Sequence, residues 1–416
     1  MNSLAPFRTA FAHARPLGYG GAGPPLMLDL SRLISRSWHP TPTGVDRVEM
    51  AYAQEFLRLC PARLAFAAQS LAWQGRLPRE LALDFLARTA RRWEGETGVP
   101  DQLQSLWGAL RLTPSPRVSA GETGGVFLHL SPRGLDRTAL IRTFLARERS
   151  RYVPFVHDLI PLEFPEYARP GGGARCRRNL ATIRALADGV LVNSHATARA
   201  LAPHLASARR PIPIMVAPLA PSLPTPVRAA EPPKRPYFVM LGTIEPRKNH
   251  LLLLAIWRSL ALELGPEATP RLVLIGRRGW ENENIVDLLD RGGIVRTVVE
   301  ERGRLPDREV SALIAGARAL VMPSFAEGFG LPVAEALSLG TPVIASDLPA
   351  LREAGGSAAE YLDPLDGAAW RTAVLDYAAP ASPRRARQLA RIARWRAPTW
   401  RAHVAGVLEF LGEIAA

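Results

Sequence analysis

The chain has 416 residues, which is more than one ordinary hydrophobic core accommodates and predicts two domains. A hydrophobic content of 47% and a charged content of 22% are those of a globular protein, and two cysteines, Cys60 and Cys176, are too few for a disulfide framework or a cysteine metal cluster. The formal net charge of +14 predicts an anionic partner, which leaves a nucleotide, a nucleic acid or lipid head groups.

Residues 1–25 are predicted to be a flexible extension, because they contain arginine but no acidic residue and end in glycines and prolines. They lack the apolar core of a secretory signal, and no apolar run in the chain reaches the length of about 18 residues that predicts a membrane-spanning helix. Gly18–Gly23 spells G-x-G-x-x-G, but no strand precedes it and prolines follow it. The sequence therefore does not predict a dinucleotide site there.

Residues 26–209 alternate between strand-like and helix-like patterns, which predicts a first α/β domain. The segment 60–120 gives mixed signals, and no role is predicted for it. The predicted strands are Leu26–Leu30, Gly125–Leu130, Arg151–Val156 and Gly189–Val192, and the predicted helices are Val48–Leu59, Leu135–Ser150 and Arg175–Ala187.

Three positions that follow predicted strands of this domain are candidates for ligand binding. Gly44 is predicted to lie in a strand-to-helix loop, where α/β proteins bind ligands, although ordinary surface loops have the same composition. His157 follows a strand and precedes Leu159–Glu166, whose prolines predict an extended loop; its imidazole could donate a hydrogen bond, carry a proton or be purely structural. Ser194 is either a helix cap or a ligand contact.

Nine prolines between residues 210 and 236 predict a linker, after which residues 237–398 form a second α/β domain. Its predicted strands are Tyr237–Leu241, Arg271–Ile275, Val295–Val299, Ala319–Met322 and Thr341–Ser346, and its predicted helices include Leu251–Leu262, Trp280–Arg291 and Ser311–Ala317.

The loop Gly242–His250 carries two cations, Arg247 and Lys248, where a helix is predicted to begin. A cation at a helix N-terminus opposes the helix dipole, and a bound anion removes that conflict. Lys248 is also one of only two lysines, with Lys234, among 52 basic residues. These observations favour a diphosphate clamp over a solvated charge pair.

The stretch Met322–Asp347 combines a strand end, a glycine turn and a helix, with Glu327 before the turn and Glu335 on the helix. Backbone N–H groups of such a turn suit a phosphate, whereas carboxylates suit hydroxyl groups. The combination predicts a sugar-nucleotide site. A solvated pair of glutamates beside an ordinary turn is the alternative.

The letters E-G-F-G-L-P-V-A-E, from Glu327 to Glu335, resemble the Glu-x7-Glu signature of the group 1 glycosyl transferases, glycosyltransferase family 4. The resemblance extends over about 236–364 and, more weakly, over 43–48 and 153–200. The run V-H-D-L-I-P-x-x-x-P-E, which begins at Val156, resembles a mannosyltransferase-like branch of that family. The resemblance implies the GT-B architecture, two doubly wound Rossmann-like domains facing a cleft, with a C-terminal helix, residues 399–414, packed back on the first domain.

The same resemblance implies roles for individual residues. His157 and Glu327 would act at the donor sugar as the catalytic residues, and Glu335 would bind the ribose. Arg247 and Lys248 would be the cations of the diphosphate clamp, because Thr243, itself implied to bind the donor, stands where many members have an arginine. The other donor-binding residues that it implies are Gly44, Arg304, Leu305, Gly328, Phe329, Gly330 and Leu331.

The predicted reaction is transfer of a sugar, with retention of configuration, from a nucleotide-diphosphate sugar to a saccharide or polyprenyl-linked saccharide. No Asp-x-Asp metal signature occurs, so neither a metal nor another cofactor is expected. The branch resemblance suggests GDP-mannose and a growing bacterial surface polysaccharide. The alternatives are a GT-B sugar-nucleotide epimerase, for which no acid–base set is evident, and a basic nucleic-acid-binding protein, for which no binding module is evident.

Residues 378–408 contain seven arginines and no acidic residue, which fits either a solvated basic helix or a membrane interface. This tail is expected to pack near the basic helices of the first domain, the acceptor side in the resembled fold. The sequence thus predicts a cytoplasmic enzyme with peripheral attachment to the inner face of the plasma membrane, and nucleic acid is not an expected partner.

Overall fold

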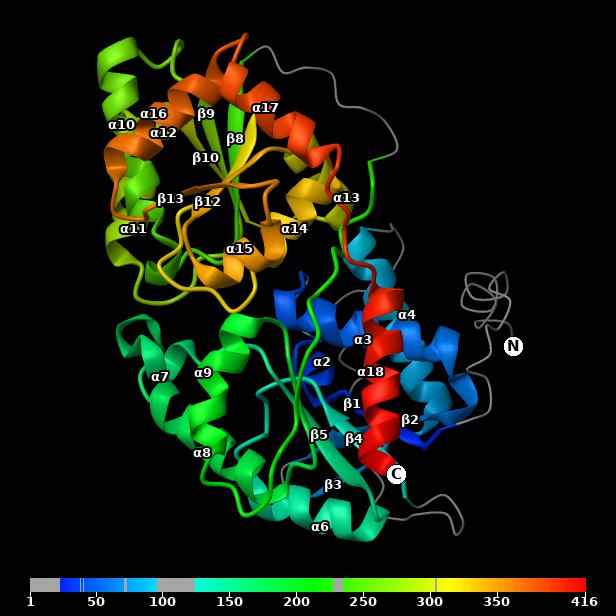
Figure 1. The fold of residues 1–416 in the computed structure, drawn as a ribbon. Helices are drawn as coiled ribbons and strands as arrows, with labels where there is room; N and C mark the ends of the chain where they lie inside the picture. Colours follow the sequence, from blue (N-terminus) through cyan, green and yellow to red (C-terminus); the bar gives the residue numbers. More distant parts are fainter. Residues whose placement is uncertain are drawn as a thin grey trace. The chain divides into compact units, whose positions relative to one another are not determined.

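The computed structural model describes residues 23–37, 39, 41–70, 73–95, 124–226, 235–303 and 305–416 (Figure 1). The described residues form two compact units. Unit 1 lies within Met1–Leu162, Gly171–Leu219 and Thr399–Ala416, and unit 2 comprises Glu163–Pro170 and Ala220–Pro398.

Unit 1 is built on a seven-stranded sheet of order β3-β2-β1-β4-β5-β6-β7, in which β2 and β3 pair antiparallel and the other neighbours pair parallel. Consecutive parallel strands run outward from β1 in one direction and from β4 in the other, so the chain order reverses between these two strands. The strands are β1 (Leu26–Asp29), β2 (Leu64–Gln69), β3 (Gln74–Arg76), β4 (Val126–His129), β5 (Arg151–Val156), β6 (Val190–Val192) and β7 (Ile214–Val216).

The helices of unit 1 pack apolar faces against this sheet. Helices α6, α8 and α9 join strand residues in one buried hydrophobic cluster, through Ile141 and Phe144 of α6, Leu180 of α8 and Leu201 of α9. The helices are α2 (Ser31–Ser35), α3 (Gly44–Leu59), α4 (Arg79–Glu94), α6 (Thr138–Glu148), α7 (Ile160–Glu163), α8 (Gly172–Leu186), α9 (His195–Leu205) and α18 (Trp400–Ala415), with a 3-10 turn, η1, at Pro61–Arg63.

The C-terminal helix α18 is part of unit 1 and packs against α3 (Figure 1). Its His403 lies between two partners: Nδ1 is 2.9 Å from the Pro218 carbonyl oxygen and Nε2 is 2.7 Å from the Tyr52 hydroxyl. The Tyr52 ring also meets the Trp400 ring edge-on, at 6.2 Å between centroids. The C-terminal helix therefore contributes to the core of a unit whose first strand begins at Leu26.

Unit 2 is built on a six-stranded parallel sheet of order β10-β9-β8-β11-β12-β13, the strand order of a dinucleotide-binding fold. Trp257 and Trp370, both fully buried, anchor α10 and α16 in the core on the sheet. The strands are β8 (Tyr237–Leu241), β9 (Arg271–Ile275), β10 (Val299–Arg302), β11 (Ala319–Met322), β12 (Val343–Ser346) and β13 (Glu360–Leu362).

The helices of unit 2 alternate with its strands, as the sequence pattern predicts. They are α10 (His250–Leu264), α11 (Glu283–Arg291), α12 (Val295–Val298), α13 (Asp307–Ala315), α14 (Leu331–Ser338), α15 (Pro349–Gly355), α16 (Gly367–Ala378) and α17 (Pro383–Ile392), with 3-10 turns η2 (Pro165–Tyr167) and η3 (Pro246–Lys248).

Two segments have a secondary structure other than the predicted one. The strand predicted at Val295–Val299 is the short helix α12 followed by β10, because Val295 and Val298 are three positions apart and both enter the core with α10. The extended loop predicted at Leu159–Glu166 contains α7 and the start of η2; its prolines occupy first-turn positions, where a missing N–H costs nothing.

The predicted linker 210–236 contains the edge strand β7, and the division between units falls after Leu219. Prolines flank β7 without entering it, so they remove none of its ladder donors.

The arginine-rich helix α17 belongs to unit 2, which contradicts the prediction that the whole tail packs near the first domain. The predicted extension at residues 1–25 lies almost wholly outside the described residues.

The buried His403 makes stability sensitive to pH. Burial lowers its pKa from 6.5 to about 4, although the bond to the Pro218 carbonyl opposes the shift. The unfolded chain therefore binds more protons between pH 6.5 and 4, so the free energy of unfolding falls as the pH drops, by up to about 1.4 kcal/mol per pH unit for this group. Urea denaturation of His403→Gln should show a shallower decline than the wild type across this window. Parallel curves would contradict the assignment.

Candidate active site

The carboxyl ends of β8 and β11 form the centre of the candidate site in unit 2. These strands are neighbours from which the chain order runs in opposite directions, and such a switch point is where open α/β sheets bind ligands. The loop after β8 carries Arg247 and Lys248, and the loop after β11 carries Glu327. The Phe325 N–H donates to the Arg247 carbonyl oxygen over 2.9 Å, so the two loops are hydrogen-bonded to each other.

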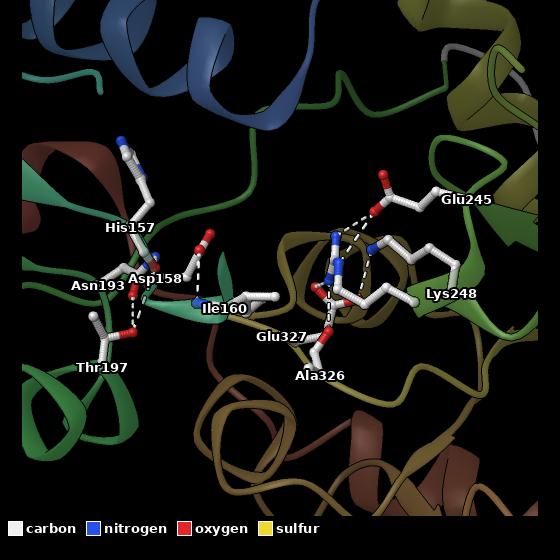
Figure 2. Close-up of polar contacts among 10 residues, drawn as sticks. His157, Asp158, Ile160, Asn193, Thr197, Glu245, Lys248, Ala326 and Glu327 are labelled. Atoms are coloured by element: carbon white, nitrogen blue, oxygen red, sulfur yellow. Dashed lines mark hydrogen bonds and ion pairs between the residues drawn. The ribbon is translucent and has the colours of Figure 1, made fainter. Parts of the chain in front are cut away.

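Glu327 bridges the two predicted clamp cations (Figure 2). Its Oε1 is 2.6 Å from Lys248 Nζ and its Oε2 is 2.8 Å from Arg247 Nη1. Arg247 Nη1 also donates to the Ala326 carbonyl oxygen over 2.5 Å, and Arg247 Nη2 donates to Glu245 Oε1 over 2.6 Å. Two buried carboxylates thus face two cations, and the cluster has no formal net charge.

The charge state of Glu327 follows from this arrangement. Its burial alone would raise the carboxyl pKa, but the positive charges of Arg247 and Lys248 outweigh that effect and lower the pKa to about 2. Glu327 is therefore an anion at neutral pH. The sequence places the positive charges of Arg247 and Lys248 at a helix start, where they would be unfavourable. In the structure Glu327 and Glu245 compensate these charges, and Lys248 lies in η3 rather than in the first turn of α10.

Glycines shape the backbone around these charges. Gly242 has φ +152°, and a Cβ there would lie 3.3 Å from Lys248 Cε, so the lysine stem passes close over the β8 loop. Gly330 has φ +99° and precedes α14, and a Cβ there would lie 2.4 Å from Leu351 Cδ2. Either position would be strained with a larger residue.

The remaining predicted donor-binding residues of unit 2 lie on the same edge of the sheet. Phe329 and Leu331 are buried, so their side chains fill the interior and only the backbone is available to a ligand. Glu335 is buried on α14, Thr243 and Leu305 are half-buried in loops that follow strands, and Gly328 lies in the turn before α14. Arg304 lies outside the described residues.

His157 lies at the carboxyl end of β5 in unit 1 (Figure 2). One hydrogen bond holds its imidazole in a single tautomer. Its Nε2 is 2.7 Å from the Leu130 carbonyl oxygen, so Nε2 carries the hydrogen and Nδ1 is left as an acceptor. Burial lowers the pKa to about 4, with a further lowering by the charge of Arg32. His157 is therefore neutral at physiological pH and can accept, rather than supply, a proton.

The backbone of His157 is fixed by the next strand end. Its carbonyl oxygen accepts from Asn193 Nδ2 at 2.9 Å and from Thr197 Oγ1 at 3.3 Å (Figure 2). Ser194 caps α9 by accepting a hydrogen bond from the Thr197 N–H at 3.0 Å. This confirms the helix cap, one of the two roles that the sequence predicts for Ser194.

Gly44 is the first residue of α3 and not part of the loop before it, which corrects the predicted helix start at Val48. The helix begins early because Asp46 accepts from the Thr43 N–H over 2.7 Å. Asp46 also accepts from Arg32 Nε and Arg36 Nε, each over 2.7 Å. Apart from the neighbouring backbone, no atom of the described residues lies within 4 Å of a Cβ built on Gly44.

Sequence reasoning missed three of these residues, Glu245, Arg32 and Asp46. The signal for Glu245 is its place immediately before Pro246-Arg247-Lys248, and the signal for Asp46 is the T-x-x-D spacing with Thr43. Among the described residues, no group of three histidine, cysteine or acidic side chains could hold a metal ion. No helix in the described part of the chain combines the length and apolar character needed to cross a bilayer.

Comparison with known proteins adds relatives for part of the chain. Residues 225–359 match the family model described as glycosyl transferases group 1. The O-antigen chain mannosyltransferase B of Escherichia coli is 41% identical over 133 residues, which are 31% of this chain and 33% of that protein. The serotype-specific mannosyltransferase WbdA of Escherichia coli is 30% identical over 223 residues, 50% of this chain and 27% of that protein. The matched stretches thus span about a third or less of these relatives.

Solved structures resemble the chain over nearly its whole length. Anabaena Alr3699/HepE in complex with UDP has a TM-score of 0.57 at 15% identity and covers 92% of this chain and 99% of its own. Sucrose-phosphate synthase from Thermosynechococcus elongatus also has a TM-score of 0.57, at 17% identity, and covers 94% of this chain and 96% of its own. At these identities the likeness concerns the fold, which is the predicted GT-B fold of two doubly wound α/β units. Over residues 225–359 the chain is similar to the group 1 glycosyl transferases.

Proposed function

We propose that the protein is a retaining glycosyltransferase that transfers mannose from GDP-mannose to a growing, lipid-linked bacterial surface polysaccharide. The observation that carries the proposal is the Lys248–Glu327–Arg247 cluster at the switch point of unit 2. Mannose and a surface polysaccharide are supported by the names of the curated relatives, two of which are O-antigen chain mannosyltransferases.

In this proposal, the diphosphate of the donor displaces the Glu327 carboxylate from the cations of the cluster. Phosphate oxygens take the place of the Glu327 carboxylate at Lys248 Nζ, 2.6 Å away in the unliganded cluster, while Arg247 retains its bond to Glu245. The released carboxylate then accepts hydrogen bonds from hydroxyl groups of the donor sugar. Because charge develops on the departing diphosphate, cations that are already positioned stabilise the transition state more than the ground state. No metal or other cofactor is needed for this step.

His157 has a different part in the proposal. A neutral imidazole with a free acceptor nitrogen orients a hydroxyl group by accepting its hydrogen bond, whereas an imidazolium could not. With no obvious nucleophile for the opposite face of the sugar, we propose that the leaving phosphate accepts the acceptor's proton on the same face. Unit 1 then supplies the acceptor side.

A peripheral place on the inner face of the plasma membrane completes the proposal. Residues 167–226 contain one acidic residue, Asp188, which already pairs with Arg151 and Arg210. The exposed arginines on α8 and α9 therefore form a positive surface, which suits anionic lipid head groups beside a lipid-linked acceptor. They are Arg175, Arg177, Arg178, Arg184 and Arg199.

Nucleotide binding tests the donor assignment. Among GDP, UDP and ADP and their sugar conjugates, GDP-mannose should raise the thermal unfolding temperature most, since a ligand at 100 times its Kd stabilises by about 2.7 kcal/mol. Glu335→Ala should lose much of the shift that GDP alone produces, whereas Glu327→Ala should keep it and lose transfer. A larger shift with UDP sugars would replace GDP-mannose as the donor, and no shift with any of them would contradict the proposed function.

The clamp is tested by Lys248→Ala. Transfer should fall more than tenfold, because a charge-assisted contact to the leaving group contributes roughly 1.5–3 kcal/mol. The exposed Arg258 on α10 provides a matched control, and Arg258→Ala should transfer at the wild-type rate. Circular dichroism should first establish that both variants fold. Normal kinetics in folded Lys248→Ala would exclude this lysine from the site.

Sedimentation with lipid vesicles tests the membrane proposal. The protein should sediment with phosphatidylglycerol vesicles at low salt and stay in the supernatant at high salt or with phosphatidylcholine. Replacing Arg177 and Arg184 together by glutamine should weaken vesicle binding by roughly tenfold or more, since each basic residue near an anionic surface contributes about 1 kcal/mol. Protein that remains in the supernatant with anionic vesicles at low salt would indicate a soluble acceptor.

A further inference from the structure

A cavity of about 310 Å³ lies on unit 2, between the end of α16 and the first turns of α17. Two arginines line it, here called the cavity arginines: Arg318, the residue before β11, and Arg385 of α17. The rest of the lining is mostly apolar and includes Pro380, Ser382, Pro383 and Leu389. Strand β11 runs from Arg318 toward the loop that carries Glu327, so the cavity lies at the amino edge of the sheet and the candidate active site at its carboxyl edge.

Backbone carbonyl groups hold both guanidinium groups in place. Arg318 Nε donates to the Tyr377 carbonyl oxygen over 2.7 Å, and Arg318 Nη2 donates to the Ala379 carbonyl oxygen over 2.5 Å. Arg385 Nε donates to the Arg318 carbonyl oxygen over 3.1 Å. Within the described part of the chain, these bonds leave Arg318 Nη1 and both Nη atoms of Arg385 available to a ligand. The fold thus positions two cations in the cavity without using all of their N–H groups.

The acidic side chains close to the cavity are engaged with other partners. Asp376 accepts a hydrogen bond from the Ser382 hydroxyl over 2.7 Å. Glu360 accepts from Arg384 Nε over 2.6 Å and from the Tyr377 hydroxyl over 2.6 Å. Neither cavity arginine forms an ion pair with an acidic side chain of the residues that the structure describes.

The cavity arginines therefore carry a charge that no described carboxylate pairs with. Partial burial lowers the pKa of both, and the charge of Arg318 lowers the pKa of Arg385 further. Arginine nevertheless stays protonated at neutral pH. Keeping two partly desolvated cations in one small cavity costs free energy, and a bound anion offsets that cost.

We propose that this cavity binds a small phosphomonoester, with its phosphoryl group between the cavity arginines and its carbon skeleton against the two prolines and Leu389. A doubly charged phosphoryl group matches two guanidinium groups, whereas a carboxylate needs a single guanidinium fork. The volume of about 310 Å³ is at the lower end of the range of about 300–1,000 Å³ for ligand pockets. A sugar phosphate is therefore of suitable size, and a nucleotide-diphosphate sugar is too large. The inference does not depend on the proposed function, because the cavity shares no residue with the candidate active site.

Calorimetric titration of the full chain with mannose 6-phosphate and with mannose tests the proposal. The phosphate ester should bind, and mannose, which lacks the phosphoryl group, should not. Arg385→Gln should weaken binding of the ester about tenfold or more, because it removes a charge-assisted contact. Arg387→Gln is the matched control and should bind as the wild type, since Arg387 is an exposed arginine of the same helix outside the lining of the cavity.

A second variant keeps the test decisive if Arg385→Gln disturbs folding. Ala386 is exposed on α17 and lines the cavity, so Ala386→Glu adds a carboxylate that competes with the phosphoryl group for the cavity arginines. This variant should keep the circular dichroism of the wild type and also lose about tenfold or more in affinity. Wild-type affinity in both variants, no binding of mannose 6-phosphate, or equal binding of mannose would each overturn the proposal.

Competition with GDP separates the cavity from the candidate active site. Saturating GDP and Lys248→Ala should both leave the affinity for mannose 6-phosphate unchanged, because the two sites lie at opposite edges of the sheet. Loss of binding under either condition would assign the ester to the Lys248–Glu327–Arg247 cluster and overturn the cavity site. If no nucleotide binds and no sugar is transferred, the proposed function fails while the Arg385 and Ala386 variants still report on the cavity.

Discussion

The site of unit 2 depends on one buried carboxylate held between two cations. A charged Glu327 side chain at this depth is tolerated only because Lys248 and Arg247 lie within 2.8 Å of its oxygens. The same pairing orders the two cations. In the proposed function, an entering diphosphate competes with Glu327 for these cations, and the displaced carboxylate is left next to the donor sugar. The proposed clamp and the proposed sugar contact are thus one coupled arrangement and not two independent sites.

In both units, charged side chains follow the two strands between which the chain order of the sheet reverses. In unit 2 the chain order reverses between β8 and β11, and the loops after these strands carry the cations and Glu327. In unit 1 it reverses between β1 and β4, and the segments after these strands carry Arg32 and Arg133. Helices on either side cover the sheet faces, so the strand ends are where polar side chains can gather without interrupting a core.

Local pattern was sufficient for much of the fold but not for the site's contacts. The strands β5, β8, β9 and β11 have the bounds that the sequence predicts, because each is a short apolar run closed by glycine, proline or a polar residue. The segment Val295–Val299 failed because its β-branched composition favours a strand while core packing at a spacing of three requires a helical turn. Arg247, Lys248 and Glu327 could be chosen individually from their motifs. Lys248 and Glu327, which form one of their ion pairs, are 79 residues apart in the sequence, and no local rule predicts that a carboxylate neutralises these cations.

The position of the charge matters more than its total. Several arginines of unit 2 are matched by acids or carbonyl groups: Arg278 contacts Asp290 and Glu301, Arg384 contacts Glu360, and Arg385 Nε donates to the Arg318 carbonyl oxygen. Some arginines of α17 therefore make contacts within unit 2, so the composition of the helix overestimates how many of them can bind an external anion. In unit 1, by contrast, residues 171–219 hold one acidic residue and seven arginines. This excess of positive charge suits an anionic acceptor or membrane, whereas a nucleic-acid-binding protein would need base-reading or stacking groups among the charges. In the proposed function, the charge therefore favours an anionic substrate at unit 1, while the cluster proposed to hold the donor has no formal net charge.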